Sequence, residues 1–267
     1  MGLARSSLRT LGNASVTPWQ WLVGWGRMLH TGAMLAVLAV SPAGRDRARR
    51  SAMARQIARD AWPLLPGFVV LATLVSVVLI RIVLTTAAGY GLSQYALEAV
   101  LRVLVMELIP LIAAAFVALR CAIPHGADVA RLRRRGELER LRRAGFDPLR
   151  LEVLPRAVAS GFAVLLLAAV SGTLAMLLAY LAVYGLSPTG FGSYTRMFGQ
   201  VFAPAVTLVF IMKIVLFALA VAVLPLASAL NEPVGQGSRS GAELRGLVRV
   251  FAVLLVVEVA SLAGNYT

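Results

Sequence analysis

Long runs of apolar residues, separated by short polar segments, dominate the chain. Five runs are candidates for membrane-spanning helices: 62–86, 96–119, 158–183, 201–230 and the shorter 247–262. A helix needs about 20 residues to cross a hydrocarbon core of about 30 Å. The runs lack the apolar and polar alternation that is typical of strands in a membrane barrel. The pattern therefore predicts an all-α integral membrane protein with about five transmembrane helices.

The segment before the first run carries a different pattern. At helical spacing, Trp19, Trp21 and Trp25 gather on one side of residues 17–30. Tryptophan suits the headgroup region, so we expect an N-terminal amphipathic helix in the membrane interface. A helix that packs against a partner is the alternative. The apolar run 34–40 is too short for a crossing. A cleaved signal peptide is disfavoured there, because basic residues begin again at Arg45.

Composition supports the membrane assignment, because 59% of the residues are hydrophobic and the mean hydropathy is +0.81. In a soluble protein the net charge of +14 would suggest nucleic acid as a partner. Here the arginines gather in alternate segments between the apolar runs: nine lie in 1–60, nine in 121–156 and three in 231–249. Residues 87–95 hold none and 184–200 hold one.

Because basic residues gather in cytoplasmic loops, this distribution predicts the topology. We expect a multi-pass protein of the bacterial inner membrane with a cytoplasmic N-terminus. Residues 1–60 would form a cytoplasmic and interfacial helical region, and residues 61–267 one transmembrane domain. The turn-rich segment 184–200 is too small to form a further domain and is expected to be an outer loop. Pro63 and Pro66 predict a kinked or re-entrant start to the first crossing.

The arginine-rich loop 121–156 is predicted to be helical in part. Its residues 127–143 are good helix formers except Gly136, which should divide them into two short helices. Asp128 can pair with Arg131, and Glu139 with the arginines three and four residues later. A nucleic-acid surface is disfavoured, because the loop is short and lies between lipid headgroups. A simple topology anchor remains an alternative, although it would need neither helices nor this length.

The residues that usually carry catalysis are sparse. His30 and His125 lie far apart in the sequence, and Cys121 is the only cysteine. Without clustered carboxylates, we expect no catalytic site, no metal site and no cofactor. Lys213 is the only lysine and no phosphate-binding loop surrounds it. Any ATP that this protein uses should therefore bind to another chain.

Charged residues inside the apolar runs are more informative. Each costs roughly 2.5–3.5 kcal/mol at a helix centre, so each needs a partner or a polar cavity. Glu107 and Lys213 lie deepest, while Arg81, Arg102 and Glu258 also fall within runs. Two interpretations stay open for Glu107 and Lys213: a wet cavity or translocation path, or a structural ion pair between the second and fourth crossings.

One stretch resembles a known family. "MELIPLIAAAFVALRCAIPHGADVARLRRRGELERLRRAGFDPLR" is similar to the MlaE/YrbE permease family, the membrane subunits of ABC transporters that work with MCE proteins. The correspondence has no gap, and weaker similarity extends over about 55–265. The positions that match are Glu107, Leu108, Pro110, Arg120, Ala127, Asp128, Asp147 and Pro148. The chain departs from the family pattern at Met106, Ile109, Gly136 and Glu137.

The resemblance implies a non-catalytic permease subunit that moves phospholipid or a related lipid between the inner membrane and a periplasmic MCE-domain assembly. It implies a second permease copy as a homodimer partner and a separate ABC ATPase subunit. Loop 121–156 would contain the coupling helix that docks on this ATPase, through Asp128, Arg131, Arg133, Arg134, Arg135, Gly136, Glu137 and Asp147. The lipid-cavity candidates are Glu107, Lys213, Arg102 and Pro110.

The departures at Gly136 and Glu137 motivate an alternative function. With altered coupling contacts, the chain would be a permease-like membrane scaffold that organises partners without ATP-coupled transport.

Overall fold

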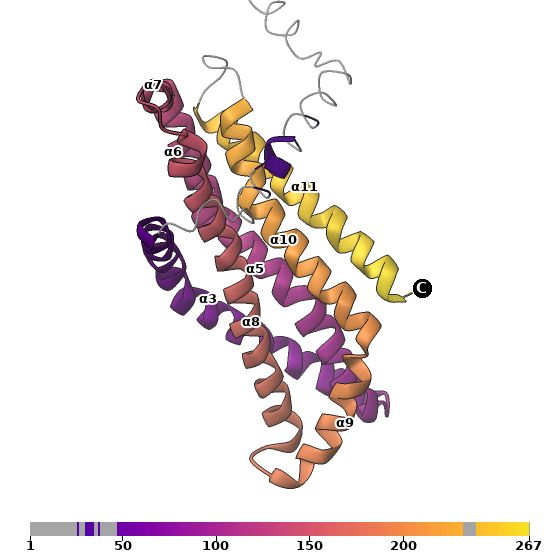
Figure 1. Cartoon of the computed structure of the whole chain (residues 1–267). Helices are drawn as coiled ribbons and strands as arrows, with labels where there is room; N and C mark the ends of the chain where they lie inside the picture. Colours follow the sequence, from indigo (N-terminus) through magenta and orange to yellow (C-terminus); the bar gives the residue numbers. More distant parts are fainter. Residues whose placement is uncertain (1–25, 27–29, 35–36, 38–46, 232–238, 267) are drawn as a thin grey trace, which may run out of the picture.

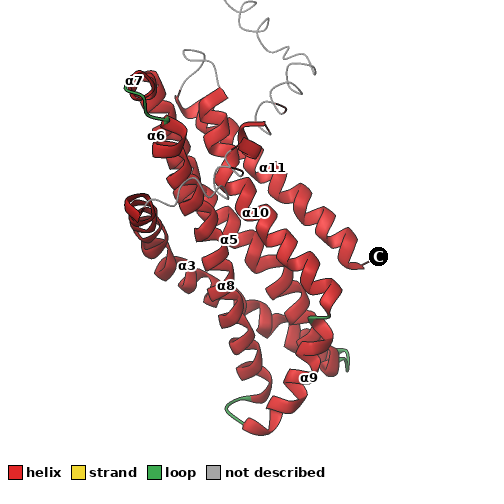
Figure 2. Cartoon of the chain, in the orientation of Figure 1, coloured by secondary structure: helices red, strands yellow, loops and turns green. Residues whose placement is uncertain are grey.

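The structure is a computed structural model that describes residues 26, 30–34, 37, 47–231 and 239–266. Its described residues form helices joined by short turns, and no strand occurs among them (Figure 2). The all-α prediction is therefore confirmed. The predicted interfacial helix 17–30 falls almost entirely outside the described residues.

Five helical segments are long and apolar enough to cross a membrane, as the sequence predicts. They are Met53–Gly89, Tyr95–Arg134, Leu149–Tyr184, Pro204–Asn231 and Gly246–Gly264. The first lies in helix α3 (Arg47–Gly89), the third in η4 (Leu149–Val153) and α8 (Leu154–Tyr184), the fourth in α10 (Pro204–Asn231) and the fifth in α11 (Arg239–Tyr266). The protein is thus a multi-pass membrane protein.

The second crossing is built from five consecutive helical pieces. They are α4 (Ser93–Val100), η2 (Leu101–Leu108), α5 (Ile109–Val117), η3 (Ala118–Ala122) and α6 (Ile123–Arg134). The stretches η2 and η3 are π-helical, a rare conformation that is frequent at functional sites. A proline follows each stretch, Pro110 after η2 and Pro124 after η3. Because proline has no N–H, it cannot donate the α-helical bond to the residue four positions earlier.

Helix α8 packs against α3, α5 and α10, and α10 packs in turn against α11 and α6 (Figure 1). The buried side of α8 is rich in small residues, among them Ala159, Ala163, Gly172, Ala175 and Ala179. Small side chains let membrane helices approach closely, which strengthens their van der Waals contacts. The result is an elongated bundle, with α6 and α7 (Glu137–Arg143) at one end and α9 (Phe191–Val201) at the other.

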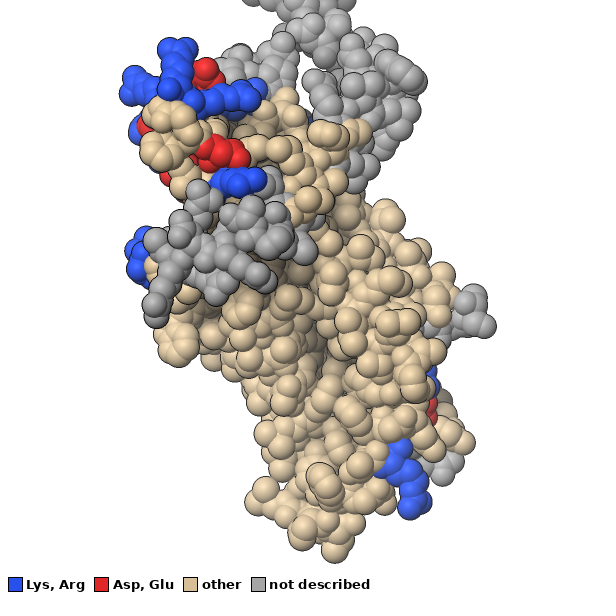
Figure 3. Space-filling view, in the orientation of Figure 1, with Lys and Arg blue, Asp and Glu red and all other residues tan. Residues whose placement is uncertain are grey.

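The arginine-rich end of the bundle, formed by α6 and α7, matches its prediction. Gly136 separates the two helices and has a left-handed φ of 69°, which a residue with a Cβ rarely adopts. Asp128 pairs with Arg131 at 3.4 Å, and Glu139 pairs with Arg143 at 3.6 Å. Lys and Arg side chains gather at this end, whereas most of the visible face is uncharged (Figure 3).

Two expectations about helix boundaries were wrong. The predicted outer loop 184–200 contains a short 3₁₀ turn, η5 (Pro188–Gly190), followed by most of helix α9. Tyr194 anchors α9, because its ring meets Tyr180 and its hydroxyl donates a hydrogen bond to the Met176 carbonyl at 3.0 Å. The fourth crossing consequently begins at Pro204 rather than 201.

The start of the first crossing is not re-entrant. Helix α3 runs without interruption through Pro63 and Pro66, and both rings are exposed on its outer side. Helices in membranes tolerate proline where the freed carbonyl finds another partner or where the helix adjusts locally. The crossing therefore continues a helix that begins well before it, at Arg47.

Candidate functional site: buried polar clusters between the crossings

Three charged side chains from three different crossings meet inside the bundle. Lys213 of α10 forms ion pairs with Glu107 of η2 and with Glu258 of α11, the second at 2.9 Å. We call these residues the charged triad. The Lys213 ammonium also donates a hydrogen bond to the Met106 carbonyl at 3.3 Å and lies 5.8 Å from the centroid of the Phe217 ring. One cation thereby connects the second, fourth and fifth crossings.

Pro110 contributes to the triad through the backbone. The α-helical donor to the Met106 carbonyl would be the N–H of residue 110, and proline lacks this group. The buried Pro110 thus removes a competing donor from the oxygen that Lys213 reaches. This gives a physical role to one of the four residues predicted as lipid-cavity candidates.

The charges within the triad do not balance when all three groups are ionised. Two carboxylates surround one ammonium, which leaves one negative charge in an apolar bundle. The Lys213 side chain is only 1% exposed, while each carboxylate side chain keeps 11% of its surface accessible. The two glutamate side chains are thus slightly more accessible than the ammonium that joins them.

The structure pairs Glu107 with Lys213, as one of the two open interpretations had it, and adds Glu258 to the pair. Arg102, another of the predicted lipid-cavity candidates, instead pairs with Glu98 one turn earlier, at 3.0 Å, and both side chains are about one third exposed. It therefore lies outside the triad. The sequence signal for Glu258 was its place inside an apolar run, but nothing in the sequence indicated which helix would face it.

A second polar cluster joins the first, second and third crossings. Cys121 of η3 and His125 of α6 lie one helical turn apart, and Asp60 of α3 and Ser160 of α8 face them. The Asp60 carboxylate lies 3.3 Å from the His125 Nε2. We call these four residues the Cys–His cluster. Sequence reasoning missed it, because His125 was compared only with the distant His30 and its partners come from other helices.

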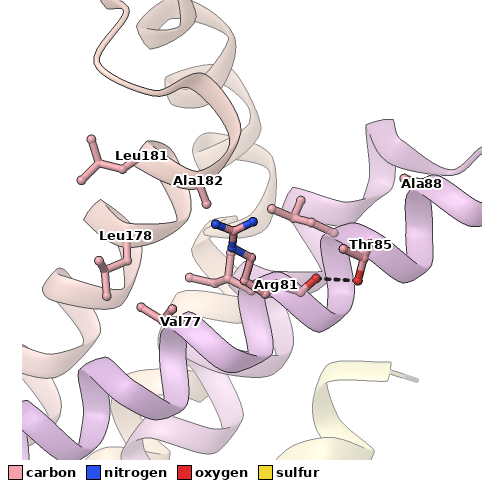
Figure 4. A pocket seen from close by; sticks show the side chains of 9 residues that line it. Val77, Arg81, Thr85, Ala88, Leu178, Leu181 and Ala182 are labelled. Carbon is pink, nitrogen blue, oxygen red and sulfur yellow. Dashed lines mark hydrogen bonds between the residues drawn. The ribbon is translucent and has the colours of Figure 1, made fainter.

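An apolar crevice opens between α3 and α8, on the α9 side of the bundle (Figure 4). Its volume is about 510 Å³, and Arg81 is the one charged residue in its lining. The Arg81 guanidinium points from α3 toward Ala182 of α8. Leucine, isoleucine, valine and alanine side chains form most of the remaining wall.

Comparison with models of protein families identifies the family of this chain. The model of the permease MlaE family matches residues 53–263, which is most of the chain and covers the first four crossings and all but the last residue of the fifth. The chain belongs to the MlaE permease family. A search of curated proteins found no match. Membership implies a membrane permease component of an ABC-type transporter, which works with an ATPase partner and is itself non-catalytic.

Within this MlaE-family chain, the predicted coupling residues lie on α6, α7 and the turns that flank α7. Arg134 and Arg135 are exposed, and Arg135 lies 3.7 Å from Glu137 across the Gly136 turn. Arg133 is half-buried and donates a hydrogen bond to the Ala229 carbonyl of α10 at 3.3 Å. The side chains thus divide into an outward set and one arginine that ties α6 to the end of α10.

Asp147 has a local role in the same region. Its carboxylate accepts a hydrogen bond from the Leu149 backbone N–H at 3.0 Å and pairs with Arg150 at 3.3 Å. It therefore shapes the turn through which the chain enters the third crossing, as its place before Pro148 predicts.

Proposed function

We propose that this permease moves phospholipid or a related lipid between the inner membrane and a periplasmic MCE-domain assembly, driven by a separate ATPase and as a homodimer. The observation that carries the proposal is the charged triad. Charged residues at membrane depth are rare and costly, and they commonly mark substrate and ion pathways. An apolar core would hold three helices together without the desolvation cost of a triad.

The triad is suited to a change of conformation. A single ammonium lies between two carboxylates that come from different crossings. A small displacement of α10 would favour one carboxylate over the other, so the cluster has two arrangements that helix movement can select. We expect the accessible part of the two glutamate side chains to face the path taken by a lipid headgroup.

The crevice between α3 and α8 offers a second contribution to lipid handling. Its apolar wall fits an acyl chain, and Arg81 supplies a cation for a headgroup phosphate. Within the described residues no ion pair neutralises Arg81, so its charge remains available to an anionic headgroup.

The coupling proposal concerns the arginine-rich end. We expect residues 127–143 to dock on the ATPase, with Arg134, Arg135 and Glu137 directed outward and Asp128 and Arg131 completing the surface. Changing Arg134 and Arg135 to glutamate should reduce recovery of the ATPase with the permease. Arg133 is better left intact, because it holds α6 to α10. Unchanged recovery together with unchanged ATPase activity would reject this docking surface.

Topology is the assumption on which docking depends, and it needs labelled positions that are accessible. Cys121 itself is buried and a poor probe. In a Cys121→Ala background, cysteines at Ala144, next to α7, and at Leu186, next to α9, would lie on opposite ends of the bundle. An impermeant maleimide should label intact spheroplasts at 186 and require permeabilisation at 144. The reverse result would invert the predicted cytoplasmic N-terminus.

The central experiment replaces Glu107 by glutamine in the complete transporter reconstituted into lipid vesicles. The change keeps shape and hydrogen bonding and removes one charge from the triad. We expect the complex to assemble while lipid transfer between membranes falls at least tenfold. Glu98→Gln is the matched control, because it removes a carboxylate from the same crossing outside the triad. Equal transfer by both variants and the unaltered protein would reject the role of Glu107.

The scaffold remains the second candidate function, favoured by the departures at Gly136 and Glu137. Co-purification separates the two. A stoichiometric ATPase whose hydrolysis depends on this chain supports transport. Recovery of an MCE-domain partner without any ATPase supports the scaffold.

A further inference from the structure

The Cys–His cluster brings together three kinds of metal-ligating side chain. Asp60, Cys121 and His125 each present one donor atom, and these atoms all lie within 4.8 Å of one another. Cys121 and His125 lie four positions apart in the sequence and therefore share one helix face. Helix α3 supplies the carboxylate from the opposite side. Three ligands of different chemistry thus converge from two crossings.

One of the distances between donor atoms matches a tetrahedral site, and a second is slightly longer. Metal–ligand distances of about 2.0–2.3 Å for N, O and S donors place such atoms about 3.3–3.8 Å apart in tetrahedral geometry. The His125 Nε2 lies 3.3 Å from the Asp60 Oδ2 and 4.0 Å from the Cys121 Sγ. The Cys121 Sγ lies nearer to Nδ1, at 3.7 Å, so metal binding requires the thiol to turn toward Nε2 and the Asp60 carboxylate.

The surroundings of His125 fix the orientation that such an ion requires. Its Nδ1 lies 3.1 Å from the Ser160 hydroxyl oxygen, so Nδ1–H can donate to Ser160 and leave Nε2, the nitrogen that faces the Asp60 carboxylate, for an ion. Ligating histidines commonly hold their second nitrogen in this way. The Gln56 amide donates a hydrogen bond to the Asp60 carboxylate at 2.9 Å and orients it in the same manner.

We propose that Asp60, Cys121 and His125 bind one divalent transition-metal ion of the Zn²⁺ class. A thiolate, an imidazole and a carboxylate together suit zinc, whereas Mg²⁺ and Ca²⁺ prefer oxygen ligands alone. Binding requires the Cys121 thiolate and the neutral His125 imidazole, and the protons displaced from these groups are released to solvent. A water molecule completes the four-coordinate shell. The cluster is 5% exposed at Cys121 and 9% at His125, so the ion would be largely shielded.

Other readings of the cluster fit the geometry less well. Ser160, His125 and Asp60 lie in the order of a hydrolase triad, but Ser160 is only 1% exposed and no substrate can reach it. Arg156 lies near Asp60 and would oppose a cation. Its charge is compensated, because its guanidinium is bonded to the Glu152 carboxylate at 2.7 Å.

The position of the site gives it a structural consequence. His125 lies in α6, the helix that leads into the arginine-rich end, and Asp60 lies in the first crossing. A bound ion would therefore fasten the base of the coupling element to α3. This inference does not depend on which lipid is transported.

Metal content of the full-length protein tests the proposal directly. The protein is purified in lipid nanodiscs, freed of its affinity tag, treated with a chelator and titrated with Co²⁺ and then Zn²⁺. We expect one Co²⁺ per chain, a thiolate-to-cobalt charge-transfer band, and loss of that band when Zn²⁺ displaces cobalt. The melting temperature should rise with Zn²⁺.

Variants identify the ligands. Cys121→Ser should abolish the charge-transfer band, which is specific because Cys121 is the only thiol in the chain. His125→Gln should weaken binding at least 100-fold, and Ser160→Ala about 10- to 100-fold by releasing the imidazole. His30→Gln is the matched control and should bind as the unaltered protein does.

Three results would overturn the proposal. The first is a monodisperse unaltered protein that binds less than a tenth of an equivalent of either metal. The second is a Co²⁺ spectrum that is unchanged in Cys121→Ser. The third is equal affinity in His125→Gln and His30→Gln. If Cys121→Ser fails to fold, the His125→Gln and Ser160→Ala affinities decide the question.

Discussion

The charged triad and the Cys–His cluster are two buried polar groups in one apolar bundle, and they differ in what holds them. The triad consists of formal charges, with one ammonium between two carboxylates. The Cys–His cluster contains a carboxylate and an imidazole in contact, together with a thiol and a hydroxyl. Each has one member in a π-helical stretch of the second crossing, Glu107 in η2 and Cys121 in η3.

Because of this difference, the two clusters should respond differently to the loss of one side chain. In the triad, the Lys213 ammonium pairs with both carboxylates. Loss of this cation therefore leaves two carboxylates facing each other. The Cys–His cluster is held by hydrogen bonds and by the contact between His125 and Asp60, so it tolerates the loss of single members. We therefore expect substitutions in the triad to destabilise the fold strongly and substitutions in the Cys–His cluster to destabilise it less.

The largest effect should follow from Lys213→Met. Removing the ammonium strands two buried carboxylates, and breaking a buried pair in this way costs about 3–5 kcal/mol. We expect a sharp loss of folded protein, measured as monodisperse yield and melting temperature in nanodiscs. The triple variant Lys213→Met, Glu107→Gln and Glu258→Gln should recover most of this loss. If Lys213→Met alone were as stable as the unaltered protein, the triad would not be the electrostatic centre of the bundle.

A smaller effect should follow from Gly126→Ala, which disturbs the packing next to the Cys–His cluster without changing the polar atoms of that cluster. A Cβ at Gly126 would lie 2.9 Å from the Pro225 carbonyl oxygen, where α6 crosses α10. Overpacking of this kind costs about 1–3 kcal/mol. Thermal unfolding measures it, and Gly67→Ala serves as control because no atom lies within 4 Å of its added Cβ. Equal melting temperatures for the two variants would contradict the close contact.

Ser160→Ala in metal-free protein should cost less again. The change removes the hydroxyl beside His125 and Cys121, and a hydrogen bond of this kind contributes about 0.5–1.5 kcal/mol. Denaturation in the presence of chelator should show this difference. A loss as large as that of Lys213→Met would mean that the two clusters do not differ as proposed.

The smallest effect should follow from Asp128→Ala at the arginine-rich end. Its pair with Arg131 is about half exposed on both sides, and exposed pairs of this kind contribute about 0.2–1 kcal/mol. The melting temperature should therefore stay close to that of the unaltered protein. A reduced recovery of the ATPase in the same variant would assign Asp128 to docking, and the failure of the fold itself would contradict its exposed position.

Much of the fold could be predicted from periodicity and composition. The length of each apolar run indicated a crossing, because hydrocarbon thickness sets the length of a helix. Gly136 divided the arginine-rich end into two helices in the predicted way, since its effect is local to the backbone. Helix α9 was missed because its support comes from Tyr180 and Met176 of another helix, which no local pattern contains.

The candidate sites show the same division. Glu107 and Lys213 were recognisable as buried charges from their places in apolar runs, and their pairing was one of the interpretations left open. The part played by Glu258, the separation of Arg102 and the whole Cys–His cluster required the packing of crossings that are distant in the sequence.

The sequence by itself determined that this protein is an all-α membrane protein with five crossings and a basic helical loop, because length, hydropathy and backbone preference act over a few turns. Only the tertiary structure decided which polar groups meet. Those meetings depend on the rotation and register of each helix against its neighbours. Helix packing sets both, and it places Asp60 beside His125 and Lys213 between two glutamates.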